Sequence, residues 1–325
     1  MKDFKWKNRK ERLRNIAISK LYSYYPFRYK RTVWLIGAGR SGTTWIASLI
    51  NIDASFRELF EPFHSCYYEL KDVGFYHHKY LNKQSLNIEL RQLAKKIFQG
   101  AFYQKRSDEG NDLIWNTRYE NILVKDVFSN LMAFEVYREN RQIKPILLIR
   151  NPFEVALSLQ RTKDWNWMKD PIDFLEQKDL VTDFLKPYEC LIRKVSKEGT
   201  FIDKQILIWA IINYIPLKQF DENVLLVTFY EHWIANPDTE LKRIYEHINL
   251  VEKEFVNLKQ VKKFKVPSKT SINNTFKTAS WRDKFSKEQL ESGEFILNSF
   301  GFKNLYNEQG IPNIGVLNNI LNKSK

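Results

Sequence analysis

The sequence has few of the residues that mark loosely structured or disulfide-rich proteins. Among 325 residues only 11 are glycine, 10 are proline and two are cysteine. With no low-complexity segment and no internal repeat, this composition argues against a fibrous, linker-rich or repeat protein. Cys66 and Cys190 lack metal-ligand spacing and are too sparse for a disulfide framework. We therefore expect a globular protein of a reducing compartment, with the cytoplasm as its location.

Long apolar runs are also lacking. The N-terminus is basic and aromatic without the apolar core of a secretory signal. The longest apolar run, Ile206–Leu217, is interrupted by Asn213 and Pro216 and is too short to span a membrane, so we expect a buried helix there. A chain of this length can form one large α/β domain. Because no linker divides it, we predict a basic extension over residues 1–31 and a single domain over residues 32–325.

The net charge of +14 is concentrated in the extension, where eleven lysines and arginines face only Asp3 and Glu11. Such a charge suggests nucleic-acid binding, but no nucleic-acid-binding module is recognisable, so we expect no nucleic-acid partner. Apolar residues recur in the extension at helical spacing. They are Leu13, Ile16, Ala17, Leu21 and Tyr24. Two interpretations stay open: a peripheral helix on an anionic membrane surface, or a helix packed on the protein's own surface.

Apolar strands alternate with amphipathic helices along the chain. Strands are predicted at Val33–Ile36, Ile122–Lys125, Ile146–Ile149 and Val224–Thr228, and helices at 43–50, 129–141, 152–162, 203–219 and 238–248. This alternation predicts an α/β, P-loop-like fold of three layers, with a central parallel sheet flanked by helices and ligands at the carboxyl ends of the strands. Residues 51–120 and 165–200 are less regular, and we expect them to form a substrate pocket or surface loops.

The most informative segment, residues 33–50, runs from an apolar strand through a glycine-rich turn into a helix. Gly37, Gly39 and Gly42 allow a tight turn, and the amide groups at the start of the helix attract an anion. Further side-chain donors at the turn are Arg40, Ser41, Thr43 and Thr44. The pattern is that of a phosphate-binding loop.

Three kinds of nucleotide site could use this turn. As a Walker A loop it has Thr43 where the phosphate-binding lysine belongs, which weakens an ATP or GTP site. As a dinucleotide fingerprint it has the Gly-x-Gly-x-x-Gly frame, with Glu58 or Glu61 near the distance of a ribose-binding acid. The third interpretation depends on a second anion-binding element farther along the chain.

That second element is the strand ending in Arg150, followed by Asn151 and Pro152 at the start of a helix that carries Ser158 and Arg161. A Mg²⁺-dependent P-loop enzyme normally ends such a strand in Asp, which helps to hold the metal. Arg150 instead indicates a direct contact with an anion. An ordinary strand-to-helix turn is the alternative for this segment taken alone.

Both elements together resemble the sulfotransferases that use 3′-phosphoadenosine 5′-phosphosulfate (PAPS). Arg-Ser-Gly-Thr-Thr-Trp at 40–45 resembles their 5′-phosphosulfate loop, and Arg-x-Pro with a following Ser resembles their 3′-phosphate motif. A strand followed by Tyr230, Glu231 and Asn236-Pro237 also matches. The resemblance implies PAPS as co-substrate, no metal, and a nucleotide held by Arg40, Ser41, Gly42, Thr43, Thr44, Trp45, Arg150, Ser158 and Tyr230.

The resemblance also implies catalytic residues. Arg40 is expected to stabilise the leaving group, and Lys125 to contact the sulfuryl group. The cytosolic members use a His as general base, which the strand around Lys125 lacks, whereas the carbohydrate and tyrosyl-protein branches use a Glu some twenty residues after the first motif. Glu61 matches, and its aromatic and proline neighbours are expected to raise its pKa. His64 and Asp126 are alternative bases.

The closest branches in this resemblance are the carbohydrate 6-O type and the tyrosyl-protein sulfotransferases. A carbohydrate or glycolipid hydroxyl is therefore the expected acceptor. A P-loop kinase and a nucleotide- or polyanion-binding protein without turnover are the alternative functions. Lys269 and Ser271 fall where the family has a loop over the nucleotide, but its usual Arg-Lys-Gly signature is absent.

Overall fold

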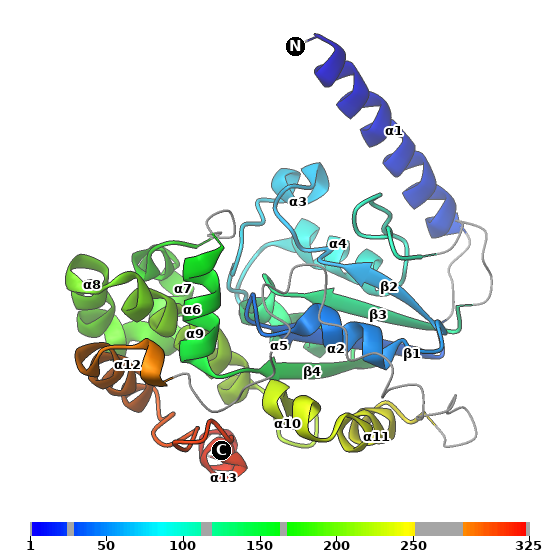
Figure 1. Cartoon of the computed structure of the whole chain (residues 1–325). Helices are drawn as coiled ribbons and strands as arrows, with labels where there is room; N and C mark the ends of the chain where they lie inside the picture. The colour runs from blue at the N-terminus through cyan, green and yellow to red at the C-terminus, as the bar shows by residue number, and fades with distance from the viewer. Residues whose placement is uncertain (1, 25–28, 112–118, 163–167, 251–281, 323–325) are drawn as a thin grey trace.

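The computed structural model describes residues 2–24, 29–111, 119–162, 168–250 and 282–322, with only the backbone for residues 2–9. Its centre is a five-stranded parallel sheet in the order β2-β3-β1-β4-β5. Figure 1 labels the first four strands of this order, β2, β3, β1 and β4. The strands are β1 (Arg31–Gly37), β2 (Phe56–Phe60), β3 (Asn121–Asp126), β4 (Ile143–Ile149) and β5 (Leu226–Phe229). The predicted α/β fold with a central parallel sheet flanked by helices is confirmed.

Helices cover both faces of the sheet because successive strand side chains point to opposite sides. Val33 and Leu35 pack with helices α2 (Thr43–Ile50) and α11 (Pro237–His247), beside the short α10 (Tyr230–Ala235). Trp34 and Ile36 belong to a larger core on the opposite face. That core includes α4 (Ile88–Phe98), α5 (Ala133–Glu139) and α9 (Phe201–Gln219).

Strand β2 and the helices after it were missing from the sequence prediction, which treated residues 51–120 as irregular. In β2 the charged residues Arg57 and Glu58 interrupt the apolar pattern that identifies a strand. Arg57 is nevertheless buried, because Asp108 pairs with it from 51 residues farther along the chain. Helix α3 (Tyr68–Asp72) and α4 then complete this region.

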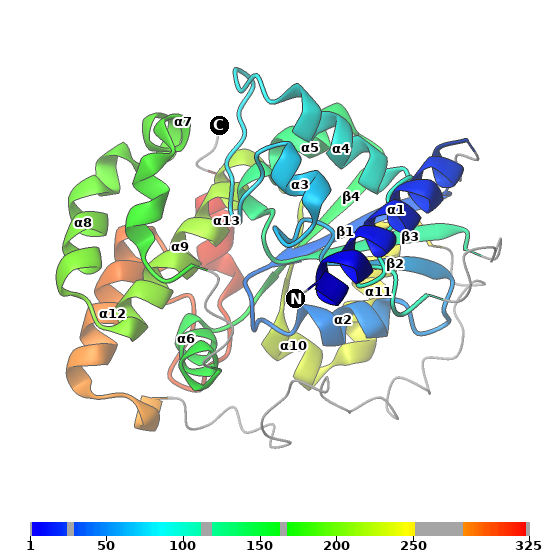
Figure 2. The same cartoon turned by 90° about the horizontal axis from the view of Figure 1, so that it is seen from above.

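A second group of helices lies to one side of the sheet in both views (Figures 1 and 2). It is formed by α6 (Pro152–Arg161), α7 (Lys178–Leu180), α8 (Glu189–Glu198), α9 and α12 (Lys287–Ser299), with α13 (Ile314–Asn322) near the C-terminus. Short helical turns at Pro171–Glu176, Val181–Leu185 and Lys186–Tyr188 join α6 to α8, so much of the region expected to be irregular over 165–200 is helical. Helices α6, α8, α12 and α13 all contact α9.

Helix α9 confirms the buried helix predicted from the run Ile206–Leu217. It begins with a capping box, in which Thr200 and Asp203 satisfy each other's backbone amides. Almost every residue from Ile202 to Leu217 is buried. A helix that is apolar all round can be stable only inside a core, which explains why so many elements pack against it.

The N-terminal helix α1 (Lys2–Tyr24) contacts the domain through Asn15 and Tyr22, and of the five predicted apolar residues only Ile16 and Leu21 are half-buried. The Asn15 amide donates to Gln104 Oε1 at 2.8 Å, and the buried Tyr22 ring lies 4.6 Å from the Arg57 guanidinium carbon. Leu13 and Tyr24 instead remain 60% and 81% exposed. In the described part of the chain, no helix is both long and apolar enough to cross a membrane.

Candidate active site

The two predicted anion-binding elements meet at the carboxyl edge of the sheet because β1 and β4 are neighbours. Arg40 Nε donates to Ser158 Oγ at 3.0 Å, across 118 residues of sequence. Arg150 Nη1 donates to the Arg40 carbonyl oxygen, also at 3.0 Å. The structure therefore joins Arg40, Ser158 and Arg150 in one cluster, which we call the arginine pair with Ser158.

The turn between β1 and α2 depends on positive backbone angles. Arg40 has a φ of 68° and Gly42 a φ of 90°, a region that non-glycine residues rarely adopt. At Gly42 there is a second constraint, because a Cβ atom would lie 2.5 Å from the Tyr230 ring. Glycine is thus required at 42 for conformation and for space.

The arginine pair with Ser158 has the electrostatics of an anion site. Burial, and secondly the charge of Arg150, lower the pKa of Arg40. Glu154 offsets part of the Arg150 charge at 3.4 Å. Two guanidinium groups held together repel each other, and a bound anion relieves that repulsion.

Three further observations fit a phosphate-bearing ligand at this turn. The Ser41 hydroxyl is buried and has no hydrogen-bond partner among the described residues. A Cβ built on Gly39 would meet nothing within 4 Å, so the turn borders open space. Thr43 is buried and Thr44 exposed at the first turn of α2, whose N-cap Gly42 supplies no side-chain cap. Amides at such a helix start are free to donate to an anion.

Tyr230 packs against the arginine pair with Ser158. Its ring is 4.4 Å from the Arg150 guanidinium carbon and makes an edge contact with the Trp45 ring, with centroids 5.7 Å apart. Trp45 is half-buried, so part of its surface stays accessible. The structure thus brings both predicted aromatic residues beside the arginine pair.

Glu231, adjacent to Tyr230, was not among the predicted site residues. Its Oε1 accepts a hydrogen bond from the backbone N–H of Asn151 at 3.0 Å, and its Oε2 accepts one from the Tyr306 hydroxyl at 3.3 Å. Burial raises the pKa of Glu231 to about 7. The carboxyl group braces the turn that presents Arg150. The only sequence signal for it was its place in the Tyr-Glu pair.

Glu61 forms a second cluster, directly after β2. Its backbone φ is 47°, and its amide donates to the Lys125 carbonyl oxygen at 2.7 Å. The side chain accepts from Lys125 Nζ at 2.8 Å on Oε1 and from Arg106 Nη2 at 2.5 Å on Oε2. Because β3 pairs in parallel with both β2 and β1, Glu61 and Lys125 lie at the same edge of the sheet as the arginine pair.

The expected rise in the pKa of Glu61 is wrong. Burial acts in that direction, but Lys125 and Arg106 together hold the pKa below its ordinary value. The carboxylate is therefore ionised at neutral pH, the state a proton acceptor needs. Sequence reasoning missed Arg106 because it lies 45 residues from Glu61, in a segment without a recognisable pattern.

The two alternative bases have different surroundings. Asp126 is fully buried and accepts from the Phe63 and Phe128 amides and the Ser129 hydroxyl. Its carboxyl group thereby holds the turn that follows Glu61. His64 is buried, its pKa is lowered to about 4 chiefly by burial, and its Nδ1 accepts from the Cys66 amide at 3.0 Å.

Two expectations concern residues or ligands outside these two clusters: the loop over the nucleotide and the binding of a metal. Lys269 and Ser271 lie outside the described residues. Within the described ranges, no group of three or more His, Cys, Asp or Glu side chains is arranged to hold a metal ion.

Comparison with known families gave one match. The profile of the sulfotransferase domain matches residues 30–296, which include both clusters. A comparison with curated proteins found no match.

Solved structures similar to this chain include several sulfotransferases. One from Alicyclobacillus acidocaldarius is 12% identical with a TM-score of 0.43, and the match covers 90% of this chain and 96% of that protein. A mouse sulfotransferase complexed with PAP is 15% identical with a TM-score of 0.41, covering 86% of each chain. Retinol dehydratase, in complex with androsterone and the inactive cofactor PAP, is 16% identical with a TM-score of 0.39, covering 92% of this chain and 88% of that one.

Proposed function

The chain belongs to the sulfotransferase domain family, and we propose that it moves a sulfuryl group from PAPS to a hydroxyl of a carbohydrate or glycolipid. The observation that carries the donor part of this proposal is the arginine pair with Ser158. It joins the two phosphate motifs of the sequence into one cationic site. A kinase is a weaker candidate, because Thr43 stands at the position of the Walker lysine and Arg150, rather than Asp, follows β4.

The nucleotide would be held from two sides. Around its 5′-phosphate we assign Ser41, Thr43, Thr44 and the amides at the start of α2, with Gly42 permitting the turn. Arg150 and Ser158 are assigned to the 3′-phosphate. Trp45 and Tyr230, which contact each other beside Arg150, are assigned to the base and its surroundings.

Three residues are assigned to the transfer itself. PAPS supplies the sulfuryl group when it is bound. Arg40 stabilises the negative charge that develops on the departing phosphate. Glu61 accepts the proton of the acceptor hydroxyl on a carboxylate oxygen. Lys125 is assigned to the sulfuryl group, as the resemblance implies, and its bond to Glu61 Oε1 also orients that carboxylate.

The acceptor assignment depends on the segment around Glu61. Phe60-Glu61-Pro62 resembles the corresponding segment of carbohydrate 6-O-sulfotransferases, and a Glu in this position also occurs in the tyrosyl-protein branch. Glu61 is ionised at neutral pH and can therefore accept a proton, while the two cations that lower its pKa also make it a weaker base. A sugar hydroxyl is accordingly the acceptor that we propose.

The donor assignment predicts metal-independent nucleotide binding. We expect 3′-phosphoadenosine 5′-phosphate (PAP) to raise the melting temperature of the protein without metal, while ATP with Mg²⁺ changes the melting temperature little. A ligand that binds only the native state adds about 2.7 kcal/mol to the free energy of unfolding at 100 times its Kd. Differential scanning fluorimetry with each nucleotide measures the effect. A larger shift with ATP and Mg²⁺ would contradict the proposal.

Single substitutions test which residues bind the 3′-phosphate, using the same melting measurement. Arg150→Ala and Ser158→Ala should each reduce the PAP-induced shift while the melting temperature without ligand stays close to that of the parent. Arg193→Ala, which removes an exposed arginine on α8, is the matched control and should retain the full shift. If Arg150→Ala and Ser158→Ala retain it too, the 3′-phosphate assignment fails.

For residues 1–31 we propose a peripheral contact with an anionic membrane. Helix α1 packs on the domain through Asn15 and Tyr22, so its opposite side is left to solvent. Figure 1 shows the N-terminal part of α1 projecting beyond the rest of the protein. The exposed side combines basic and apolar residues, as interfacial helices do: Lys10, Leu13, Arg14, Ala17, Lys20 and Tyr24.

This contact predicts salt-sensitive binding to vesicles that contain phosphatidylserine. Lys10→Glu/Lys20→Glu should abolish co-sedimentation with them, because each basic residue near such a surface contributes about 1 kcal/mol. Lys194→Glu/Lys197→Glu on α8 makes the same charge change away from α1 and should leave binding unchanged. Equal losses in the two double variants would mean that net charge alone is responsible.

A further inference from the structure

Arg106 contacts the proposed base but belongs to neither phosphate motif. Its Nη2 bonds to Glu61 Oε2 at 2.5 Å, and its Nη1 lies 3.5 Å from the Tyr67 hydroxyl. The guanidinium carbon is 5.0 Å from the centre of the Phe60 ring. These contacts give the side chain a defined position even though 40% of it is exposed.

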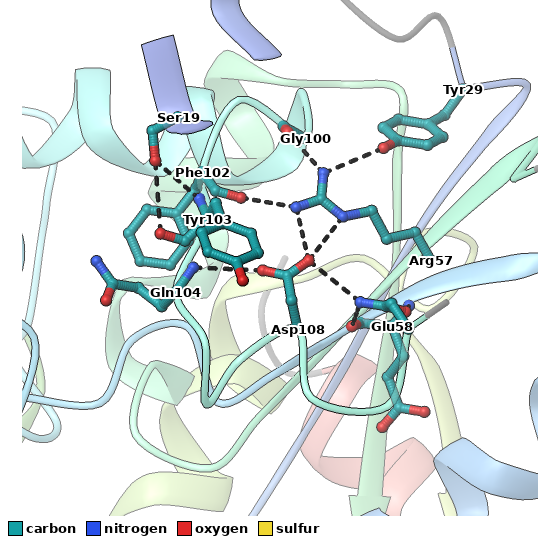
Figure 3. Close-up of polar contacts among 10 residues, drawn as sticks. Ser19, Tyr29, Arg57, Glu58, Gly100, Phe102, Tyr103, Gln104 and Asp108 are labelled. Carbon is teal, nitrogen blue, oxygen red and sulfur yellow. Dashed lines mark hydrogen bonds and ion pairs between the residues drawn. The ribbon is translucent and has the colours of Figure 1, made fainter. Parts of the chain in front are cut away.

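The segment that carries Arg106 is fixed to β2 by a buried arginine. Arg57 donates to the carbonyl oxygens of Gly100 and Phe102 and to Asp108 Oδ1, at 2.7 to 2.9 Å (Figure 3). Both partners of the Arg57–Asp108 pair are almost fully buried. The pair therefore clamps both ends of the turn that presents Arg106.

Backbone contacts continue this clamp up to Glu61. The Phe60 amide donates to the Ser107 carbonyl oxygen at 2.8 Å, and the Glu58 amide donates to Asn111 Oδ1 at 2.9 Å. Residues next to Glu61 and next to Arg106 are thus bonded directly to each other. These hydrogen bonds hold Glu61 and Arg106 close together, so the contact between their side chains is fixed by the surrounding structure.

We propose that Arg106 is a positioning residue for Glu61, delivered by the Arg57–Asp108 clamp, and this inference rests on the proposed role of Glu61 as the base. Lys125 holds Oε1 from the buried side and Arg106 holds Oε2 from the solvent side. Each carboxylate oxygen can accept more than one hydrogen bond. Each oxygen of Glu61 therefore keeps capacity for a hydrogen bond from the acceptor hydroxyl while both cations keep the carboxylate oriented and ionised.

Several charged or titratable groups face Glu61. Lys125 from β3 and Arg106 favour its ionised form, while burial opposes ionisation. Among the described residues, the other titratable groups that interact electrostatically with it are Asp126, His64, Tyr67, Cys66 and His77. If Arg106 is removed, burial is opposed by Lys125 alone, so the pKa of Glu61 must rise.

The test is a direct titration of Glu61 in the full chain. Protein labelled with ¹³C at the glutamate side-chain carboxyl is titrated by NMR, and the Glu61 signal is identified by its loss in Glu61→Gln. Arg106→Gln should raise the pKa of Glu61 by about 1, the lower end of the range for losing one nearby opposite charge. Arg106→Lys should restore most of the parental value, because it keeps the charge.

Lys105→Gln is the matched control, since it removes the neighbouring exposed charge and is expected to leave the titration unchanged. An unchanged titration in Arg106→Gln would overturn the proposal, as would equal shifts in Arg106→Gln and Lys105→Gln. The PAP-induced melting shift is measured on the same variants and should be retained. If PAP does not raise the melting temperature of the parent protein, the proposed function is contradicted, whatever the titration shows.

Discussion

Replacing Glu61 with Gln is expected to lower turnover by roughly 10²- to 10⁴-fold while PAP binding is retained. Gln has nearly the same shape and can still accept a hydrogen bond from Lys125 or Arg106, but it cannot take the proton of the acceptor hydroxyl. Transfer from labelled PAPS to a panel of glycans first identifies an acceptor, and initial rates on that acceptor then measure the loss. Arg40→Ala should also lower turnover, through lost stabilisation of the leaving group.

Controls separate the role of Glu61 from general effects on the fold. Glu109→Gln makes the same chemical change at an exposed position and should leave the rate unchanged. Melting curves show whether the loss of the anion beside buried Lys125 destabilises the native state. His64→Ala should cost much less activity than Glu61→Gln. A nearly parental rate in Glu61→Gln beside an inactive His64→Ala would move the base from Glu61 to His64.

Replacing Arg57 with Met is expected to destabilise the protein by about 3–5 kcal/mol. The substitution leaves Asp108 buried without its partner, and it removes the donors to the Gly100 and Phe102 carbonyl oxygens (Figure 3). Burial already raises the pKa of Asp108, and Arg57 is the main influence that opposes this rise. Urea unfolding followed by circular dichroism measures the change in the free energy of unfolding.

Arg193→Met is the matched control, because Arg193 pairs with Glu189 on the exposed surface of α8. It should cost less than about 1 kcal/mol. The double variant Arg57→Met/Asp108→Leu should recover part of the stability lost in Arg57→Met, since no buried charge is then left unpaired. Similar losses in Arg57→Met and Arg193→Met would show that the buried pair contributes no more than a surface pair.

The local sequence determined four of the five strands, β1, β3, β4 and β5, and the two anion-binding elements at the ends of β1 and β4. An apolar strand, a turn with glycine at 42 and a helix start are encoded within a few residues, because backbone preferences and strand periodicity are local properties. Parallel strands end at one edge of the sheet, so Arg40 and Arg150 could be assigned to the same site before their contact was known. The confirmed α/β fold and the buried helix α9 follow from the same local patterns.

Only the tertiary structure decided the strand β2, the ionisation of Glu61 and the packed face of α1. In β2, Arg57 is buried because Asp108 lies 51 residues away, a partner that no periodicity reveals. The surroundings of Glu61 predicted a raised pKa, yet Lys125 and then Arg106, which comes from a segment 45 residues away, hold the pKa below its ordinary value. Burial and charge interactions depend on distance in space, whereas helix and strand patterns depend on distance along the chain.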